Sequence, residues 1–196
     1  MTMDAFEVVV IGGGPCGATA AHDLARAGRR VLLLDRQGRI KPCGGAIPPK
    51  AIVDFDIPDS QLVAKVKRAR MISPKGHKVV IPIEDGFVGM VDREHFDEWL
   101  RTRAAEDGAE RRAGSFVRID RAEDGTAIVV YRPKGDDKMG EPVGVRAKMV
   151  IGADGARSNV ARQEVPGGDK IPYVIAYHEI IESPTGADWD GEMCDV

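Results

Sequence analysis

The feature that most constrains the fold is the stretch from Phe6 to Asp35, where two apolar runs flank a glycine-rich turn and a helix. Phe6–Ile11 is short and rich in β-branched residues, which is typical of a buried parallel strand. Cys16–Ala27 is predicted as a helix that Gly28 ends, and Arg30–Asp35 is predicted as the second strand. Such a β-α-β unit predicts an α/β domain with a parallel sheet.

The turn between the first strand and the helix matches the pattern G-x-G-x-x-G at Gly12, Gly14 and Gly17. The first glycine permits a tight turn, the second lets the backbone approach a pyrophosphate, and the third lets helix and strand pack closely. A pyrophosphate would sit on the helix N-terminus. Asp35, at the end of the second strand, can accept hydrogen bonds from a ribose diol. The unit therefore predicts a dinucleotide site, without choosing between NAD and FAD.

A second glycine turn, "VIGADGARS", places Asp154 and Gly155 just past another apolar strand, which includes Lys148–Ile151 and is expected to be buried. Ala-Asp-Gly by itself is an ordinary turn. In an open parallel sheet, however, strand ends of this kind meet at the ligand crevice. A pair of such turns suits a cofactor that is longer and more deeply buried than NAD.

The remaining segments predict one helix and two hairpins. The helix covers Asp92–Asp107, with Asp92 as its N-cap and Gly108 as its end. The first hairpin joins "ARMISP" to "KVVIPI", and the second joins "GSFVRI" to "TAIVVYRP". Tyr173–Ile181 is predicted as a new alternating strand whose sheet the last residues cannot complete. We therefore expect the chain to be the N-terminal half of a longer protein.

Composition excludes several classes of function. The net charge is −3, so there is no global case for binding nucleic acid. The three cysteines, Cys16, Cys43 and Cys194, are odd in number and lack metal-ligand spacing. They predict a reducing compartment, a cytoplasmic location and no metal site. No stretch approaches the ~18 apolar residues that a membrane span needs.

Together these motifs resemble a known superfamily. G-x-G-x-x-G with Asp35, "REHFDEWL" with Arg93, Asp97 and Leu100, and "GADGARS" are similar to the FAD-binding set of the flavoprotein hydroxylases and reductases. Within that superfamily, "KPCGGAIP" and "GMVDREHFD" resemble the geranylgeranyl reductase family, in its photosynthetic branch acting on chlorophyll or bacteriochlorophyll. The resemblance runs from about residue 6 to the end of the chain.

The resemblance implies a Rossmann-like FAD-binding domain of the glutathione-reductase and hydroxylase type, followed by the beginning of a second, mainly β substrate domain. The implied FAD-binding domain is discontinuous, over residues 1–70 and 88–162. Residues 71–87 and 163–196 would belong to the incomplete substrate domain. The fragment by itself is expected to be inactive.

The resemblance also implies the chemistry. NADPH would reduce FAD, and the flavin would reduce three of the four double bonds of a geranylgeranyl chain, leaving phytyl. The substrate would be prenylated (bacterio)chlorophyll or geranylgeranyl diphosphate. Because such substrates are greasy, peripheral association with photosynthetic membranes is expected, while the pigment head group, the order of reduction and the oligomeric state stay open.

Site residues are implied position by position. Gly12, Gly14 and Gly17 would hold the FAD pyrophosphate, Asp35 the adenosine ribose, and Asp154 the phosphate and ribose region with NADPH docking. Arg93 would contact the cofactor from its helix. The full cofactor-binding set is Gly12, Gly14, Pro15, Cys16, Gly17, Asp35, Arg36, Cys43, Gly44, Gly45, Ala46, Arg93, Val117, Asp154 and Gly155.

Within "RIKPCGGAIPPK", Gly44 and Gly45 would let the backbone lie against the flavin ring, and Pro42 and Pro48 would stiffen the approach. Cys43 would face the ring or the alkene. An isolated alkene has no carbonyl to accept charge, so hydride addition needs a proton as well. Cys43 is the candidate donor, but a free thiol has a pKa of about 8.5 and is a poor acid for an alkene. A small wall residue is the preferred interpretation.

Three alternatives stay open. An archaeal-type reductase would perform the same chemistry on lipid chains. An aromatic hydroxylase or halogenase would share every glycine motif but has no need of the Cys-Gly-Gly stretch. A flavin-binding or assembly module without turnover would need only the nucleotide site.

Overall fold

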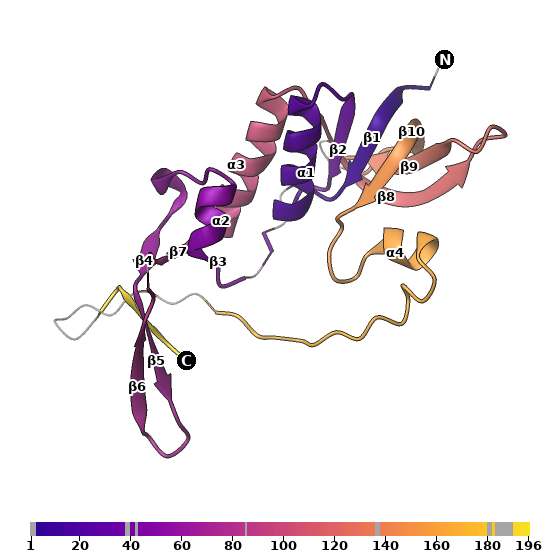
Figure 1. Cartoon of the computed structure of the whole chain (residues 1–196). Coiled ribbons are helices and arrows are strands. Elements are labelled where there is room, and N and C mark those ends of the chain that lie inside the picture. The colour runs from indigo at the N-terminus through magenta and orange to yellow at the C-terminus, as the bar shows by residue number, and fades with distance from the viewer. Residues whose placement is uncertain are drawn as a thin grey trace. The chain divides into compact units, whose positions relative to one another are not determined.

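The computed structural model describes residues 3–37, 40–41, 43–84, 86–135, 138–179, 182 and 190–196. The chain divides into two compact units. The first comprises Met1–Arg39 with Asp97–Ile175, and the second comprises Ile40–Phe96 with Ala176–Val196. Figure 1 gives the order of the elements along the chain.

The sheet of the first unit contains the predicted parallel strands. Its members are β1 (Ala5–Ile11), β2 (Val31–Asp35), β8 (Glu110–Arg121), β9 (Ala127–Pro133) and β10 (Val143–Gly152). β1 lies between β2 and β10 and runs parallel to both, and the first residues of β8 pair in parallel with β2. The prediction that Phe6–Ile11, Arg30–Asp35 and Lys148–Ile151 form parallel strands of one sheet is confirmed.

β8 takes part in two kinds of pairing. Through Ala113 it follows β2, and from Gly114 onward it pairs antiparallel with β9, which then pairs antiparallel with β10. The ladder of strands therefore closes on itself in the order β1-β10-β9-β8-β2. A Cβ on Gly114 would lie 2.7 Å from the Tyr131 ring, so a glycine is needed where β8 passes closely over β9. The predicted hairpin between β8 and β9 is confirmed.

Three helices accompany this sheet. α1 (Pro15–Arg26) lies against β1 and β2 (Figure 1), and its small residues Ala18, Ala21 and Ala25 are buried. α3 (Arg93–Glu106) begins as predicted, because the Glu94 amide donates to the Asp92 carboxylate over 2.9 Å. α4 (Asn159–Glu164) packs on β8.

The core of the first unit is aliphatic. Apolar side chains of the strands fill it, joined by Val160 of α4. Its buried members are Phe6, Val9, Ile11, Leu32, Leu34, Ile119, Val129, Tyr131, Val145, Ala147 and Val160. Strands buried on both faces become continuous apolar runs, which is why "EVVVI" and "VLLLD" were readable in the sequence.

The second unit holds two small sheets. One has the order β3-β7-β4 and the other β11-β5-β6. Their strands are β3 (Ala46–Ile47), β4 (Ala64–Val66), β5 (Arg68–Ile72), β6 (Lys78–Pro82), β7 (Val88–Met90) and β11 (Met193–Asp195). The predicted hairpin is β5 with β6, paired antiparallel. The helix α2 (Pro49–Asp54) and the 3₁₀ turn η1 (Asp59–Gln61) connect β3 to β4.

Two predictions about strands need correction. Residues 173–179 of the predicted strand Tyr173–Ile181 form no regular structure, and Val174 is 92% exposed. Residues 180 and 181 lie outside the described part. An alternating pattern forms a strand only where a partner supplies hydrogen bonds, and no described strand pairs with residues 173–179.

Lys148–Ile151 was expected to be buried, but Met149 is 61% exposed. Val143–Ala147 of β10 pair with β9, and of these residues Arg146 and Ala147 also pair with β1. The second half pairs, among the described strands, with β1 alone. Val145 and Ala147 are buried where β10 pairs with β9, whereas Met149, beyond the last pair with β9, is exposed.

The boundary between compact units differs from the predicted domain boundaries. Residues 40–70 and 88–96 lie in the second unit, and residues 163–175 lie in the first. The predicted division into an FAD-binding domain and a substrate domain stays a prediction. Within the described residues, no helix is long and apolar enough to cross a lipid bilayer.

Candidate cofactor site

The two predicted glycine turns lie against each other in the first unit. The Gly12 amide donates to the Leu34 carbonyl over 2.8 Å, and the Ala153 amide donates to the Ile11 carbonyl over 2.8 Å. The ends of β1, β2 and β10 are therefore joined by backbone hydrogen bonds. Gly12 has a φ of +109°, and a Cβ on it would lie 2.6 Å from the Ala153 carbonyl carbon. Only glycine satisfies both conditions.

Gly14 is different, because nothing in the chain itself requires a glycine there. Its φ of −72° and ψ of −179° suit any residue, and no atom lies within 4 Å of the place a Cβ would take. It is the N-cap of α1 and has no side chain to satisfy the first-turn amides. This bare, open helix start is the cradle that a pyrophosphate needs, and a side chain would fill it.

The neighbours of Gly14 complete the start of α1. Pro15 occupies the first helical position, where its fixed φ costs nothing and its missing N–H is not needed by the helix. Cys16 follows and is exposed. Gly17 allows close packing, since a Cβ on it would lie 3.0 Å from the Ala153 Cβ and would collide with the Gly12 carbonyl oxygen. The residue at each position of the predicted motif is thus explained by a different physical requirement.

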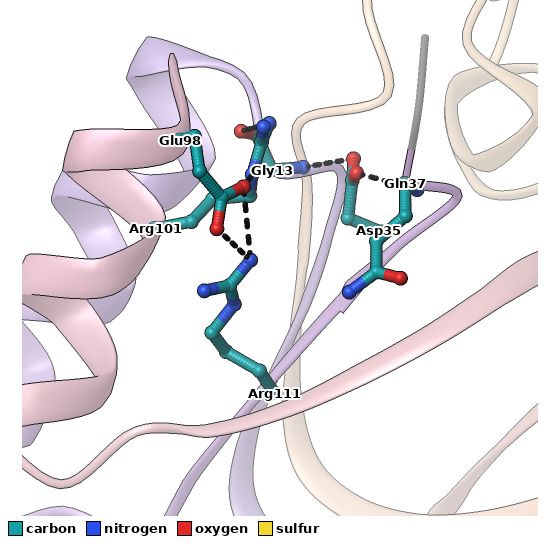
Figure 2. Close-up of polar contacts among 6 residues, drawn as sticks. All are labelled: Gly13, Asp35, Gln37, Glu98, Arg101 and Arg111. Carbon is teal, nitrogen blue, oxygen red and sulfur yellow. Dashed lines mark hydrogen bonds and ion pairs between the residues drawn. The ribbon is translucent and has the colours of Figure 1, made fainter. Parts of the chain in front are cut away.

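Asp35 lies at the end of β2 beside this turn (Figure 2). Its Oδ2 accepts the Gly13 amide over 2.8 Å, and its Oδ1 accepts the Gln37 amide over 3.0 Å. Each carboxylate oxygen has two lone pairs, so both can still accept a ribose hydroxyl. Arg36 is exposed next to it. The predicted ribose contact fits this arrangement and stays a prediction.

Asp154 has a structural task that the sequence did not reveal. Its carboxylate accepts the Ser158 hydroxyl, and it accepts the amides of Asn159 and Val160 over 2.7 and 3.3 Å. Ser158 in turn caps α4 by accepting the Ala161 amide over 2.8 Å. The carboxylate therefore orders the chain after the second turn, and its predicted contact with FAD or NADPH would be additional.

Two other residues of the predicted cofactor-binding set are Gly155, which lies in the second glycine turn, and Val117, which lies in β8. Gly155 has a φ of +90° and follows Asp154 directly. Val117 lies at an irregularity in the pairing of β8 with β9 and is 39% exposed. Val117 lies in the part of β8 that pairs with β9 and no longer with β2. The pairing of β8 with β2 therefore does not place Val117 at the Gly12 turn.

The Cys-Gly-Gly stretch belongs to the second unit, and its two glycines differ. Gly45 has a φ of +71°, its carbonyl accepts the Val91 amide over 3.0 Å, and a Cβ on it would collide with the Val91 carbonyl oxygen. The fold itself requires this glycine. Gly44 has no atom within 4 Å of its Cβ position, and Ala46 begins β3 and is exposed. Of the two glycines, Gly44 is therefore the one whose missing side chain the fold itself does not require.

The prolines of this stretch also have separate roles. Pro48 is the N-cap of α2, and Pro49 occupies its first turn. Pro42, which we expected to stiffen the approach, lies outside the described residues.

The environment of Cys43 favours its ionised form. The Gly45 amide is the main cause, and it lowers the pKa of the Cys43 thiol although burial opposes this; a hydrogen bond from Arg93 and the charge of Lys41 lower it further. Cys43 is exposed. Within the second unit Arg93 thus interacts with Cys43, a relationship that the sequence analysis did not foresee. A lowered pKa leaves less of the thiol protonated at neutral pH, which weakens the proton-donor role.

Arg101 was missed altogether. Its Nη1 donates to the Gly13 carbonyl oxygen over 2.9 Å, from a helix far along the chain. No local pattern marks such a residue, because an arginine on an amphipathic helix is usually a solvated one.

Comparison with known proteins identifies the family. A family model described as pyridine nucleotide-disulphide oxidoreductase matches residues 6–179. The chain belongs to this family. It is 60% identical over 192 residues to the geranylgeranyl diphosphate reductase of Rhodobacter capsulatus, covering 97% of this chain and 48% of that protein. It is 40% identical to the chloroplastic geranylgeranyl diphosphate reductase of Nicotiana tabacum, covering 90% of this chain and 39% of that protein.

These two relatives confirm the predicted resemblance of the chain to the geranylgeranyl reductases. The chain spans about half the length of the curated relatives it matches, 48% of the Rhodobacter protein.

Solved structures confirm the fold. A geranylgeranyl bacteriochlorophyll reductase-like protein from Thermoplasma acidophilum matches with a TM-score of 0.77 and 25% identity, covering 99% of this chain and 50% of that one. A flavin-dependent brominase matches with a TM-score of 0.67 and 22% identity, covering 82% of this chain and 41% of that one, and shows the fold alone. The predicted α/β Rossmann-like FAD-binding architecture is confirmed.

Proposed function

We propose that this oxidoreductase chain carries the FAD site of a geranylgeranyl reductase that uses NADPH to reduce the prenyl chain of a (bacterio)chlorophyll precursor. The open space at Gly14, at the uncapped start of α1, is the observation that carries the cofactor assignment. The similarity to a geranylgeranyl diphosphate reductase over nearly the whole chain supports the substrate class. Among the substrates proposed are geranylgeranyl diphosphate and the prenylated pigment.

The residues present fit FAD. The first-turn amides of α1 would receive the pyrophosphate, and Asp35 would accept the hydroxyls of the adenosine ribose. When bound, FAD would supply hydride chemistry, with NADPH as the reductant. The chain's own contribution is to bind and orient the cofactor through the Gly12 and Asp154 turns, which the hydrogen bond from the Ala153 amide to the Ile11 carbonyl holds together.

The role of Cys43 is proposed as that of a small wall residue. A geranylgeranyl double bond needs a proton as well as a hydride. The Gly45 amide and Arg93 lower the pKa of the Cys43 thiol, which favours its ionised form over a protonated donor. The proton would then come from another group of the complete protein.

The experiment uses the complete protein. We expect a yellow preparation whose FAD is released on denaturation, and NADPH oxidation that depends on added geranylgeranyl substrate. Mass spectrometry should show the prenyl product gaining two hydrogens for each double bond reduced. A colourless protein that binds NADPH tightly and no flavin would contradict the cofactor assignment. NADPH oxidation without any saturated product would contradict the reductase assignment.

One alternative substrate has sequence support of its own. The chain is 36% identical over 162 residues to a digeranylgeranylglycerophospholipid reductase of Methanopyrus kandleri. The higher identity to the Rhodobacter protein favours the pigment branch. The same assay with digeranylgeranylglycerophospholipid in place of the pigment separates the two, and faster reduction of the lipid would reverse the preference.

A further inference from the structure

Both peptide groups of Gly13 are fastened by side chains. Its amide donates to Asp35 Oδ2 over 2.8 Å, and its carbonyl oxygen accepts Arg101 Nη1 over 2.9 Å. Figure 2 shows Asp35 and Arg101 meeting Gly13 from opposite sides. Gly13 is itself buried. The residue just before the open Gly14 position therefore cannot rotate without breaking one of two hydrogen bonds to charged groups.

Arg101 is in turn held by an ion pair with Glu98. Its Nε donates to Glu98 over 2.9 Å, and Arg111 of β8 donates to both oxygens of the same carboxylate over 2.9 and 3.1 Å. The Arg101 side chain is only 13% exposed. A guanidinium is a planar fork, so a partner on Nε fixes the direction of Nη1. Glu98 and Arg111 thus aim Arg101 at the Gly13 carbonyl.

The middle glycine of Gly12-Gly13-Gly14 is a variable position in the G-x-G-x-x-G pattern. Here a Cβ on Gly13 would lie 2.9 Å from Arg101 Cδ and 2.9 Å from Asp35 Cβ and Cγ. The glycine at this position is therefore explained by the two side chains that close over it, and not by the turn. The absence of a side chain at Gly13 is thus a second sign that the loop accommodates the contact with Arg101.

The Gly13 carbonyl and the Gly14 amide belong to one planar peptide group. Arg101 therefore sets the direction of the Gly14 N–H, at the place where no atom fills the side-chain space. We propose that Arg101, aimed by Glu98 and Arg111, is a positioning residue that holds the Gly13–Gly14 peptide in its pyrophosphate-binding orientation before the cofactor arrives. This inference rests on the proposed FAD site.

A positioning role has a kinetic signature. If the loop without Arg101 visits the binding orientation only part of the time, the apparent affinity falls by that fraction, through slower association. Dissociation from the bound state changes little, because a residue that only positions the loop makes no contact with the cofactor. A direct contact would behave in the opposite way and speed dissociation when it is removed.

The test measures FAD association and dissociation by stopped-flow quenching of flavin fluorescence, using the complete apoprotein. The variants are Arg101→Gln, Arg101→Lys and Gly13→Ala. The control is Arg121→Gln, which removes an arginine from an exposed ion pair with Glu164 that does not involve the loop. Thermal unfolding of each apoprotein reports whether the fold is intact.

We expect Arg101→Gln to slow association roughly tenfold, the scale of one hydrogen bond to a charged group, with dissociation changed less than twofold. Gly13→Ala should also slow association, because its methyl group would push Arg101 and Asp35 apart. Arg101→Lys should restore association in part, since lysine can reach one partner but lacks the fork. Arg121→Gln should behave as the wild type.

Three outcomes overturn the inference. Equal association in wild type and Arg101→Gln means that the carbonyl contact does not orient the loop. Faster dissociation with normal association makes Arg101 a direct cofactor contact. Slow association in Gly13→Ala only, with Arg101→Gln normal, leaves Asp35 as the residue that matters. Failure of the wild type to bind FAD at all would instead reject the proposed function, so the two failures are distinct.

Discussion

Gly12 and Ala153 are in backbone contact, with the Cβ position of Gly12 only 2.6 Å from the Ala153 carbonyl carbon. Each residue directly follows a parallel strand, and the Ala153 amide is bonded to the carbonyl of Ile11, the residue before Gly12. The contact joins the two glycine turns into one surface at the carboxyl ends of the parallel strands β1, β2 and β10.

Gly12→Ala should therefore be strongly destabilising. The new methyl group meets backbone atoms that cannot move away, and φ at +109° is unfavourable for alanine. We expect a loss of about 3 kcal/mol or more in the free energy of unfolding measured with urea. Gly28→Ala is the matched control: φ is +73° but the Cβ space is empty, so the loss should be only about 1 kcal/mol. Equal losses would show that the Ala153 contact is unimportant.

Gly14→Val should separate cofactor binding from folding. The backbone of Gly14 suits any residue and its side-chain space is open. The apoprotein should unfold within about 1 kcal/mol of the wild type, while FAD binding measured by flavin fluorescence should be abolished. Gly17→Ala provides the contrast, since its methyl group would strike the Gly12 carbonyl and should damage the fold itself. Normal FAD binding by Gly14→Val would remove the main support for the site.

The two glycines of the Cys-Gly-Gly stretch should respond differently. Gly45→Val should destabilise the protein, because φ is +71° and its Cβ collides with the Val91 carbonyl. Gly44→Val should leave the melting temperature nearly unchanged and reduce flavin binding or turnover, if this stretch meets the flavin as the resemblance implies. A Gly44→Val enzyme with full flavin content and full turnover would show that the open position has no ligand.

Cys43 should be alkylated at lower pH than an ordinary thiol. Iodoacetamide reacts with the thiolate, so a lowered pKa moves the midpoint of the rate-against-pH curve below about 8.5. In a Cys16→Ser, Cys194→Ser background only Cys43 reacts. Adding Arg93→Gln removes a hydrogen bond and a positive charge that stabilise the thiolate, so the midpoint should move upward. A midpoint that does not move would show that Arg93 does not act on the thiol.

Cys43→Ala distinguishes a wall residue from a proton donor. In the complete enzyme we expect flavin to be retained and much of the alkene reduction to survive. Stopped-flow measurement should follow reduction of FAD by NADPH separately from its reoxidation by the prenyl substrate. Loss of the second half-reaction alone, with substrate still bound, would make Cys43 the general acid.

Local sequence signals were sufficient for much of this fold. The β-branched runs of β1 and β2, the stop at Gly28 and the cap at Asp92 each act within a few residues, so they could be read without a structure. Tyr173–Ile181 shows the limit of the same reasoning. Its alternation is real, but a strand needs hydrogen bonds from a partner, and the described residues supply none.

The sequence by itself determined the β-α-β unit, the glycine positions at which a turn or a close approach is needed, and the family resemblance that those motifs carry. Tertiary structure alone decided which glycine serves the fold and which leaves room for a cofactor. It also decided that Asp154 orders α4, that Arg93 interacts with Cys43, and that Arg101 fastens Gly13. These are contacts between side chains and distant backbone atoms, and their energies depend on distances that no local pattern of residues specifies.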